Sequence, residues 1–66
     1  MQFFIEDLSC NHCAGVITKT VTALDPAATL RIDIPAKTVQ IQTAASPAVI
    51  AAALNEAGYP AKLQET

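Results

Sequence analysis

The chain of 66 residues contains two cysteines, which stand close together as Cys10-Asn11-His12-Cys13. Two reduced thiols at this spacing indicate a metal-binding pair or a redox pair, whereas a secreted disulfide scaffold usually carries four or more cysteines. The thiolate is the form of cysteine that binds metal and acts as a nucleophile. The pair is therefore the first candidate for chemistry, and its meaning depends on the elements that position it.

Soft thiolate ligands select Cu(I) among intracellular ions, with Zn(II) as the main competitor. Closed structural zinc sites use four ligands, and this chain offers two cysteines, one histidine and no other ligand cluster near them. Two thiolates suffice for Cu(I), which accepts two-coordination, and they leave the ion open to attack by a further thiolate. Glu6 and Asp7 stand close to Cys10 in the sequence, so zinc is kept as an alternative cargo.

The residues in front of the pair alternate in the way that a β-strand does. Over residues 2–8, Phe3 and Ile5 share one face and Phe4 lies on the other, which predicts a strand with Phe4 on the open side of a sheet. The polar run 9–12 then predicts a loop that leads into a helix. The cysteine pair is therefore expected where a strand gives way to a helix.

A helix is expected over residues 13–24, because apolar residues recur there at helical spacing. Pro26 follows its end, since proline disfavours the helical conformation in the residue before it. Cys13 then falls in the first helical turn, where unpaired backbone N–H groups and the helix dipole favour an anionic thiolate. The core-facing positions of this helix are Ala14, Ile17, Val21 and Leu24.

Two further strands follow this helix. Residues 28–34 and residues 38–43 alternate, and residues 35–37 join them in a tight turn, so the two segments are expected to form a hairpin. The inward positions of the hairpin are Leu30, Ile32, Ile34, Val39 and Ile41.

A second helix and a last strand complete the chain. Ser46 and Pro47 predict the start of the helix, as N-cap and first helical residue. Gly58 predicts its end, because glycine accepts the left-handed conformation there. Residues 59–63 are expected to form the last strand, with Pro60 at its start or on a sheet edge. The apolar stripe of the helix consists of Ile50, Ala53, Leu54 and Ala57.

The resulting order is strand-helix-strand-strand-helix-strand, which is the ferredoxin-like βαββαβ arrangement of the α+β class. It predicts a four-stranded antiparallel sheet with two helices on one face. Residues 1–66 are expected to form this single domain, since the chain is long enough for one small core only.

Charge and hydropathy patterning exclude several classes of partner. The net charge is −2 and the four basic residues are scattered, whereas a nucleic-acid partner requires a basic stripe. No apolar run approaches the roughly 20 residues of a membrane span, and the N-terminus lacks the pattern of a signal peptide. We therefore expect a cytoplasmic protein with no nucleic-acid partner and no membrane insertion.

Catalysis is not expected either. A chain of this length has little room for a deep substrate cavity. The six acidic residues form no paired-carboxylate site and are expected to be solvated charges.

The sequence resembles the heavy-metal-associated domain family, and in particular its small bacterial copper chaperones. The family's strand–helix connection reads Met-x-Cys-x-x-Cys, often with His before the second Cys, and here it reads Leu8-Ser9-Cys10-Asn11-His12-Cys13. The family's second helix often ends in Gly-Tyr, as it does here in Gly58-Tyr59. Two residues depart from the pattern: Leu8 replaces the usual Met, and Asp7 stands where Gly is common.

The resemblance implies a non-enzymatic Cu(I) carrier. Cys10 and Cys13 would hold one ion and pass it by ligand exchange to the metal-binding domains of a copper-transporting P-type ATPase. The resemblance further implies that Leu8 tethers the loop from below and that Tyr59 approaches the pair and shields the metal. His12 is expected beside the pair, either as a solvated residue or as a group that tunes the site. Copper-bridged homodimers are common in the family, so a metal-linked dimer is left open.

Three alternatives stay open at this point. The same fold could carry zinc, cadmium or mercury, and the chain could be an excised metal-binding domain of a transport ATPase. A thiol–disulfide oxidoreductase is the remote alternative, because its Cys-x-x-Cys also opens a helix. That scaffold is longer than this chain, which also lacks tryptophan. Tyr59 has a second interpretation too, as a structural residue that covers the end of the second helix.

Overall fold

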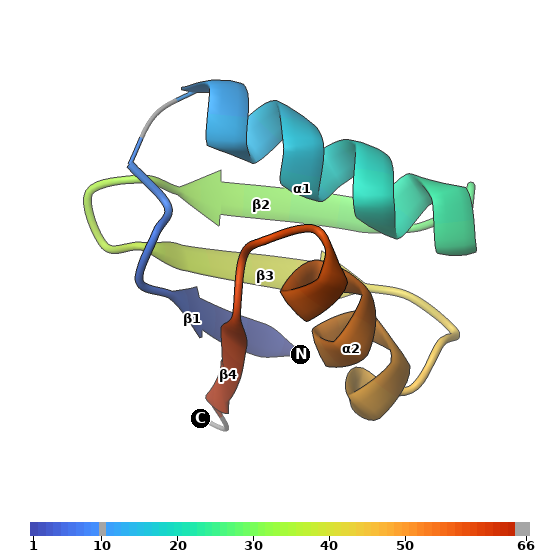
Figure 1. Ribbon diagram of the computed structural model, residues 1–66. Helices are drawn as coiled ribbons and strands as arrows, with labels where there is room; N and C mark the ends of the chain where they lie inside the picture. The colour runs from blue at the N-terminus through green and yellow to red at the C-terminus, as the bar shows by residue number, and fades with distance from the viewer. Residues whose placement is uncertain (10, 65–66) are drawn as a thin grey trace.

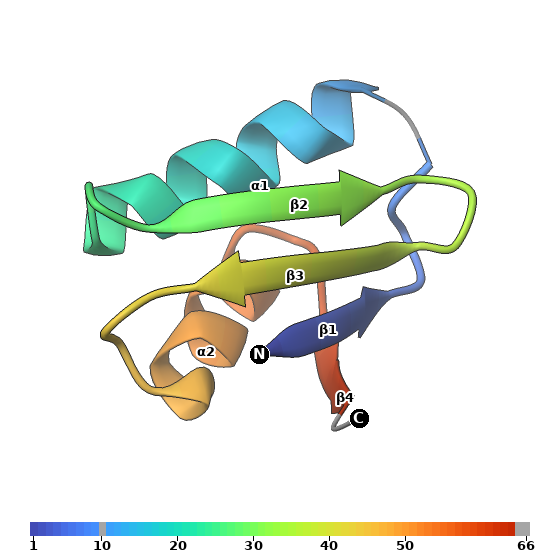
Figure 2. The same cartoon turned by 180° about the vertical axis from the view of Figure 1, so that it is seen from behind.

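The computed structural model describes residues 1–9 and 11–64. Its sheet has the order β2-β3-β1-β4, and neighbouring strands pair antiparallel. Both helices lie on one face of this sheet (Figure 1), and the view from behind shows the other face uncovered (Figure 2). The predicted fold class and element order are confirmed. The elements are β1 (Gln2–Ile5), α1 (Asn11–Leu24), β2 (Thr29–Asp33), β3 (Thr38–Gln42), α2 (Pro47–Glu56) and β4 (Ala61–Gln64).

The region around the cysteines differs from the prediction in two boundaries. β1 ends at Ile5, where a turn begins that is closed by a 3.1 Å bond from the Leu8 N–H to the Ile5 carbonyl. α1 begins at Asn11 rather than Cys13, so the predicted loop over 9–12 is too long. Polar residues suit this turn because the first N–H groups of a helix have no partner within it and are satisfied by side chains, water or ligands instead.

The core fills the space between the sheet and the two helices. Side chains from the sheet and from both helices meet in it, and on β1 the alternation of Phe3 and Ile5 is confirmed. The hairpin residues Leu30, Ile32 and Ile34 are half-buried and pack against this core, because β2 is an edge strand. The buried residues are Phe3, Ile5, Leu8, Cys13, Ile17, Val21, Val39, Ile41, Ile50 and Leu54.

Leu24 is the one predicted core position of α1 that lies exposed. Its side chain is 46% exposed, whereas Ile17 and Val21 are fully buried. Leu24 is the last residue of α1. Periodicity therefore assigned its face correctly, but a side chain at the end of a helix extends past the elements that cover the rest of the stripe.

The predicted caps of α2 are confirmed. The Ser46 side chain accepts a 3.3 Å bond from the Val49 N–H, and proline occupies the first turn. At the other end Gly58 adopts a φ of +93°. The Gly58 N–H donates to the Asn55 carbonyl at 3.1 Å and the Tyr59 N–H to the Leu54 carbonyl at 2.9 Å, which is the Schellman arrangement. This motif fixes the backbone at Tyr59.

Asp25 corrects the expectation that every carboxylate is a solvated charge. Its Oδ2 accepts a 2.7 Å bond from the Thr43 hydroxyl and a 3.3 Å bond from the Ala44 N–H, while Oδ1 accepts from the Ala27 N–H at 3.0 Å. The Thr43 hydroxyl and then the two backbone N–H groups lower the pKa of Asp25. The residue joins the end of α1 to the segment between β3 and α2.

Candidate metal-binding site

Cys13 lies in the first turn of α1, as predicted, and its side chain is 8% exposed. The first N–H groups of the helix point toward this end of α1 and favour an anion there. An anionic thiolate is the form that binds metal. Cys10, the other half of the predicted pair, lies outside the described residues, so the metal-binding role of both cysteines stays a prediction.

The segment that leads to the cysteines is fixed to the sheet. Leu8 is fully buried in the core, and its N–H closes the turn onto the Ile5 carbonyl. The Ile5 N–H in turn donates to the Lys37 carbonyl at 2.8 Å, which ties the end of β1 to the β2–β3 hairpin. The burial of Leu8 fits the tether that the resemblance implies, with leucine in place of methionine.

Tyr59 lies at the same end of the molecule as the cysteine segment. Ile5, the last residue of β1, pairs with Ala61, the first residue of β4. The residues just before β4 therefore lie beyond the end of β1, and the chain turns toward Cys13 at this same end. Tyr59 is half-buried and packs against the core. Its position fits the predicted approach to the pair, and its role as a shield of the metal stays a prediction because Cys10 lies outside the described residues.

A small cavity of about 120 Å³ lies between the turn that follows β1 and the segment that leads into β4. It combines side chains from β1 and the turn after it with side chains from the start of β4. Phe4 lines this cavity on the open side of the sheet, as its strand parity predicts. The lining residues are Phe4, Glu6, Asp7, Pro60, Ala61 and Lys62.

His12 and its neighbours decide what further ligands are available. His12 is helical and exposed, and Glu6 and Asp7 are exposed on the turn. Within residues 1–9 and 11–64, no three His, Cys, Asp or Glu side chains come together in a way that could hold a metal ion. The described part of the chain therefore supplies no closed ligand set of the kind that structural zinc sites use.

Sequence reasoning missed the contribution of Lys37. Its carbonyl holds the end of β1, and its φ of 58° is unusual for a residue with a side chain. The predicted turn over 35–37 indicated a bend at this place. It gave no sign that the bend would contact β1, because that contact depends on the order of strands in the sheet.

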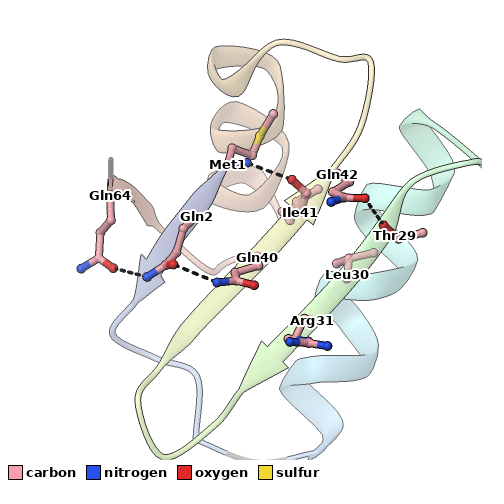
Figure 3. Close-up of a pocket in the computed structure, with 9 residues that line it drawn as sticks. All are labelled: Met1, Gln2, Thr29, Leu30, Arg31, Gln40, Ile41, Gln42 and Gln64. Atoms are coloured by element: carbon pink, nitrogen blue, oxygen red, sulfur yellow. Dashed lines mark hydrogen bonds between the residues drawn. The ribbon is translucent and has the colours of Figure 1, made fainter. Parts of the chain in front are cut away.

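A larger hollow of about 610 Å³ lies on the open face of the sheet (Figure 3). Glutamine side chains from three strands cross it in a row: Gln40 Nε2 donates to Gln2 Oε1 at 3.2 Å, and Gln2 Nε2 to Gln64 Oε1 at 3.1 Å. Among the described residues that line it there is no cysteine, histidine or carboxylate. The Met1 thioether is the one soft ligand among the described residues that line it, so the cysteine end, where a thiolate is available, is the better candidate for metal chemistry.

Comparison with known proteins settles the family. The family model described as "Heavy-metal-associated domain" matches residues 2–60. The chain belongs to the heavy-metal-associated domain family. No curated protein matches it, and neither described helix of this heavy-metal-associated domain is long and apolar enough to span a membrane.

Solved structures of similar proteins agree with this assignment. The crystal structure of a gold binding protein shares 44% identity at a TM-score of 0.91, covering 94% of this chain and 95% of that one. The structure of the copper chaperone Atx1 from Synechocystis PCC6803 shares 31% sequence identity at a TM-score of 0.91, and the match covers 94% of this chain and 98% of that one. The solution structure of a cyanobacterial copper metallochaperone, ScAtx1, shares 29% sequence identity at a TM-score of 0.77, and the match covers 94% of this chain and 97% of that one. Metal-binding chaperones thus have this fold.

Proposed function

We propose that this heavy-metal-associated domain is a non-enzymatic Cu(I) chaperone of the cytoplasm. Cys10 and Cys13 bind one ion through their thiolates and deliver it to the metal-binding domains of a copper-transporting P-type ATPase. The observation that carries the proposal is the position of Cys13, at the start of α1 and directly behind a segment fixed by Leu8. The similarity to copper chaperones supports the choice of cargo.

The delivery step is an exchange of ligands without change of oxidation state. A thiolate of the acceptor's own cysteine pair adds to the two-coordinate ion and forms a three-coordinate bridge between the proteins. One thiolate of the donor pair then leaves, and the second acceptor thiolate replaces the other. The copper is never released as a free ion, and over the whole transfer two metal–sulfur bonds form and two break.

An anaerobic Cu(I) titration in reductant tests the binding site. The wild type is expected to bind one ion per monomer, and Cys10→Ser and Cys13→Ser are each expected to lose tight binding, because one thiolate cannot hold the ion alone. Ser9→Ala is the matched control, since Ser9 is exposed and adjacent to the pair. Tight binding that is unchanged in either cysteine variant would refute the proposal.

Gold is a second candidate cargo, because the gold binding protein shares 44% identity with this chain. Both gold and copper in their monovalent states prefer sulfur ligands, so the same two thiolates suit either ion. Competition between Cu(I) and Au(I) for the wild-type protein separates the two candidates. If stoichiometric Au(I) displaces bound Cu(I), and stoichiometric Cu(I) does not displace bound Au(I), gold is favoured as the cargo.

A further inference from the structure

The connection between β2 and β3, residues 34–37, lies beside the end of β1 (Figures 1 and 2). In the ladder between β1 and β3, the last pair is Phe4 with Thr38. The next residue of β1, Ile5, donates from its N–H to the Lys37 carbonyl at 2.8 Å. On its other side Ile5 pairs with Ala61 of β4. Ile5 is therefore held from both sides at the point where the chain leaves the sheet.

The path from Ile5 to the cysteines is short. The Ile5 carbonyl accepts a 3.1 Å bond from the N–H of Leu8, whose side chain is fully buried. Cys10 follows two residues later in the sequence, and Cys13 lies in the first turn of α1. The two backbone groups of Ile5 thus join the β2–β3 connection to the turn that leads into the cysteine pair. A shift of the Lys37 carbonyl would release the sheet end of this segment.

Lys37 reaches Ile5 through an uncommon backbone conformation. Its φ is 58°, and within the described part of the chain no other residue with a side chain has a positive φ. Glycine is the usual residue at such a position of a hairpin. The Lys37 N–H closes the connection by donating to the Ile34 carbonyl at 3.0 Å. Because φ and ψ are the only soft dihedrals of the backbone, the direction of the Lys37 carbonyl depends on this conformation.

We propose that Lys37 is a positioning residue for metal binding. Its left-handed backbone holds Ile5, and through Ile5 it holds the segment that leads to the cysteine pair. This inference rests on the proposed function, since it concerns how tightly Cys10 and Cys13 bind Cu(I). A segment that is ordered before the ion arrives loses less conformational freedom on binding, which raises the affinity. The backbone of Lys37 has this effect, and its ammonium group is not required.

Substitutions of Lys37 separate the backbone from the charge. Lys37→Gly and Lys37→Asn remove the ammonium group but accept the left-handed conformation, so both should bind Cu(I) within about twofold of the wild type. Lys37→Val removes the same charge, and its branched side chain disfavours that conformation. It should bind Cu(I) about three- to tenfold more weakly, which is the range expected for the loss of one backbone hydrogen bond. Anaerobic competition with a Cu(I) chelator measures all four proteins.

Two control variants exclude other causes of weaker binding. Lys62→Val makes the same change on β4, where extended backbone suits a branched side chain, and should leave the affinity unchanged. Thr43→Val removes a hydrogen bond to Asp25 beyond the end of β3, which lies away from the cysteine segment (Figure 1). It should lower stability without changing the affinity. A loss confined to Lys37→Val therefore reports neither charge nor general stability.

Amide hydrogen exchange of the metal-free protein tests the positioning itself. In Lys37→Val the exchange of the Ile5 N–H should rise about tenfold or more, and that of the Leu8 N–H should rise with it, because local opening exposes both. Lys37→Gly should leave both rates near those of the wild type, as should Lys62→Val. A wild type that binds no Cu(I) would end the proposed function, and the exchange rates would then decide on Lys37 alone.

Three results would overturn the proposal. The first is a Lys37→Val variant that exchanges at Ile5 like the wild type. The second is a Lys37→Val variant that retains the Cu(I) affinity of a binding wild type. The third is an equal loss of affinity in Lys37→Gly and Lys37→Val, which would assign the effect to the ammonium group. Should Lys37→Val fail to fold, Lys37→Thr, which is branched but polar, takes its place with the same expected results.

Discussion

Leu8 is fully buried beneath the connection between β1 and the cysteine pair. Its N–H closes the turn on Ile5, so its side chain and its backbone both hold the segment in place. Leucine has about the volume of methionine, and a swap between the two is among the best tolerated in a core. The departure from the family pattern at this position is therefore conservative in packing.

Leu8→Ala is expected to lower the free energy of unfolding by about 2–5 kcal/mol, because it leaves a cavity in a small core. Leu8→Met is the control and should cost less than about 1.5 kcal/mol. Urea denaturation of the metal-free protein measures both. An alanine variant as stable as the methionine variant would mean that Leu8 does not anchor the turn.

His12 is exposed in the first turn of α1. Within the described residues no group of three His, Cys, Asp or Glu side chains could hold a metal ion, and the place of His12 beside the pair stays a prediction. His12→Ala is expected to keep one Cu(I) per monomer and to change its affinity less than about tenfold, below the loss typical when a group supporting a metal ligand is removed. Competition with a Cu(I) chelator measures the affinity, and loss of the one-to-one complex would show that His12 is a ligand.

At the scale of elements, the sequence predicts the elements themselves better than their boundaries. The caps of α2 were predictable because Ser46, Pro47 and Gly58 each act locally. The start of α1 was not, because Asn11 and His12 are polar in either a loop or a first helical turn. The exposure of Leu24 and the contact of Lys37 with β1 depend on which elements lie nearby, which local patterns do not encode.

Asp25 links two elements through hydrogen bonds that require the ionised carboxylate, and they lower its pKa in the folded protein. A lowered folded-state pKa contributes stability above the unfolded value, and that contribution is lost as the pH falls through the folded value. We therefore expect the stability advantage of the wild type over Asp25→Asn to shrink as the pH falls below the ordinary value of 3.8.

Urea denaturation of both proteins between neutral and acidic pH measures this difference. Thr43→Val is the control, because it removes the hydroxyl that lowers the pKa of Asp25 most and should reduce the same pH dependence. A difference between wild type and Asp25→Asn that is constant over the whole range would contradict the role assigned to the carboxylate.

A chain of 66 residues has little core to spare. Its buried apolar side chains lie between the sheet and the helices, whereas the open face carries a row of paired glutamines. Small domains gain much from a ligand that binds only the folded state. Cargo binding at the start of α1 should therefore stabilise the entire fold.

Cu(I) at a hundredfold excess over its dissociation constant should add about 2.7 kcal/mol, which corresponds to a rise in Tm of about 10–20 °C for a domain of this size. Anaerobic calorimetry with and without one equivalent of Cu(I) measures it. Cys13→Ser is the control and should show no rise. An equal rise in that variant would place the bound copper elsewhere.

In the proposed chaperone, one Cu(I) is held by the two cysteine thiolates and left open for transfer. X-ray absorption at the copper edge of the dilute, anaerobic one-to-one complex measures this ligand set. Two sulfur ligands and no nitrogen or oxygen ligand are expected. A closed four-coordinate copper, or a ligand set that includes histidine nitrogen, would contradict it.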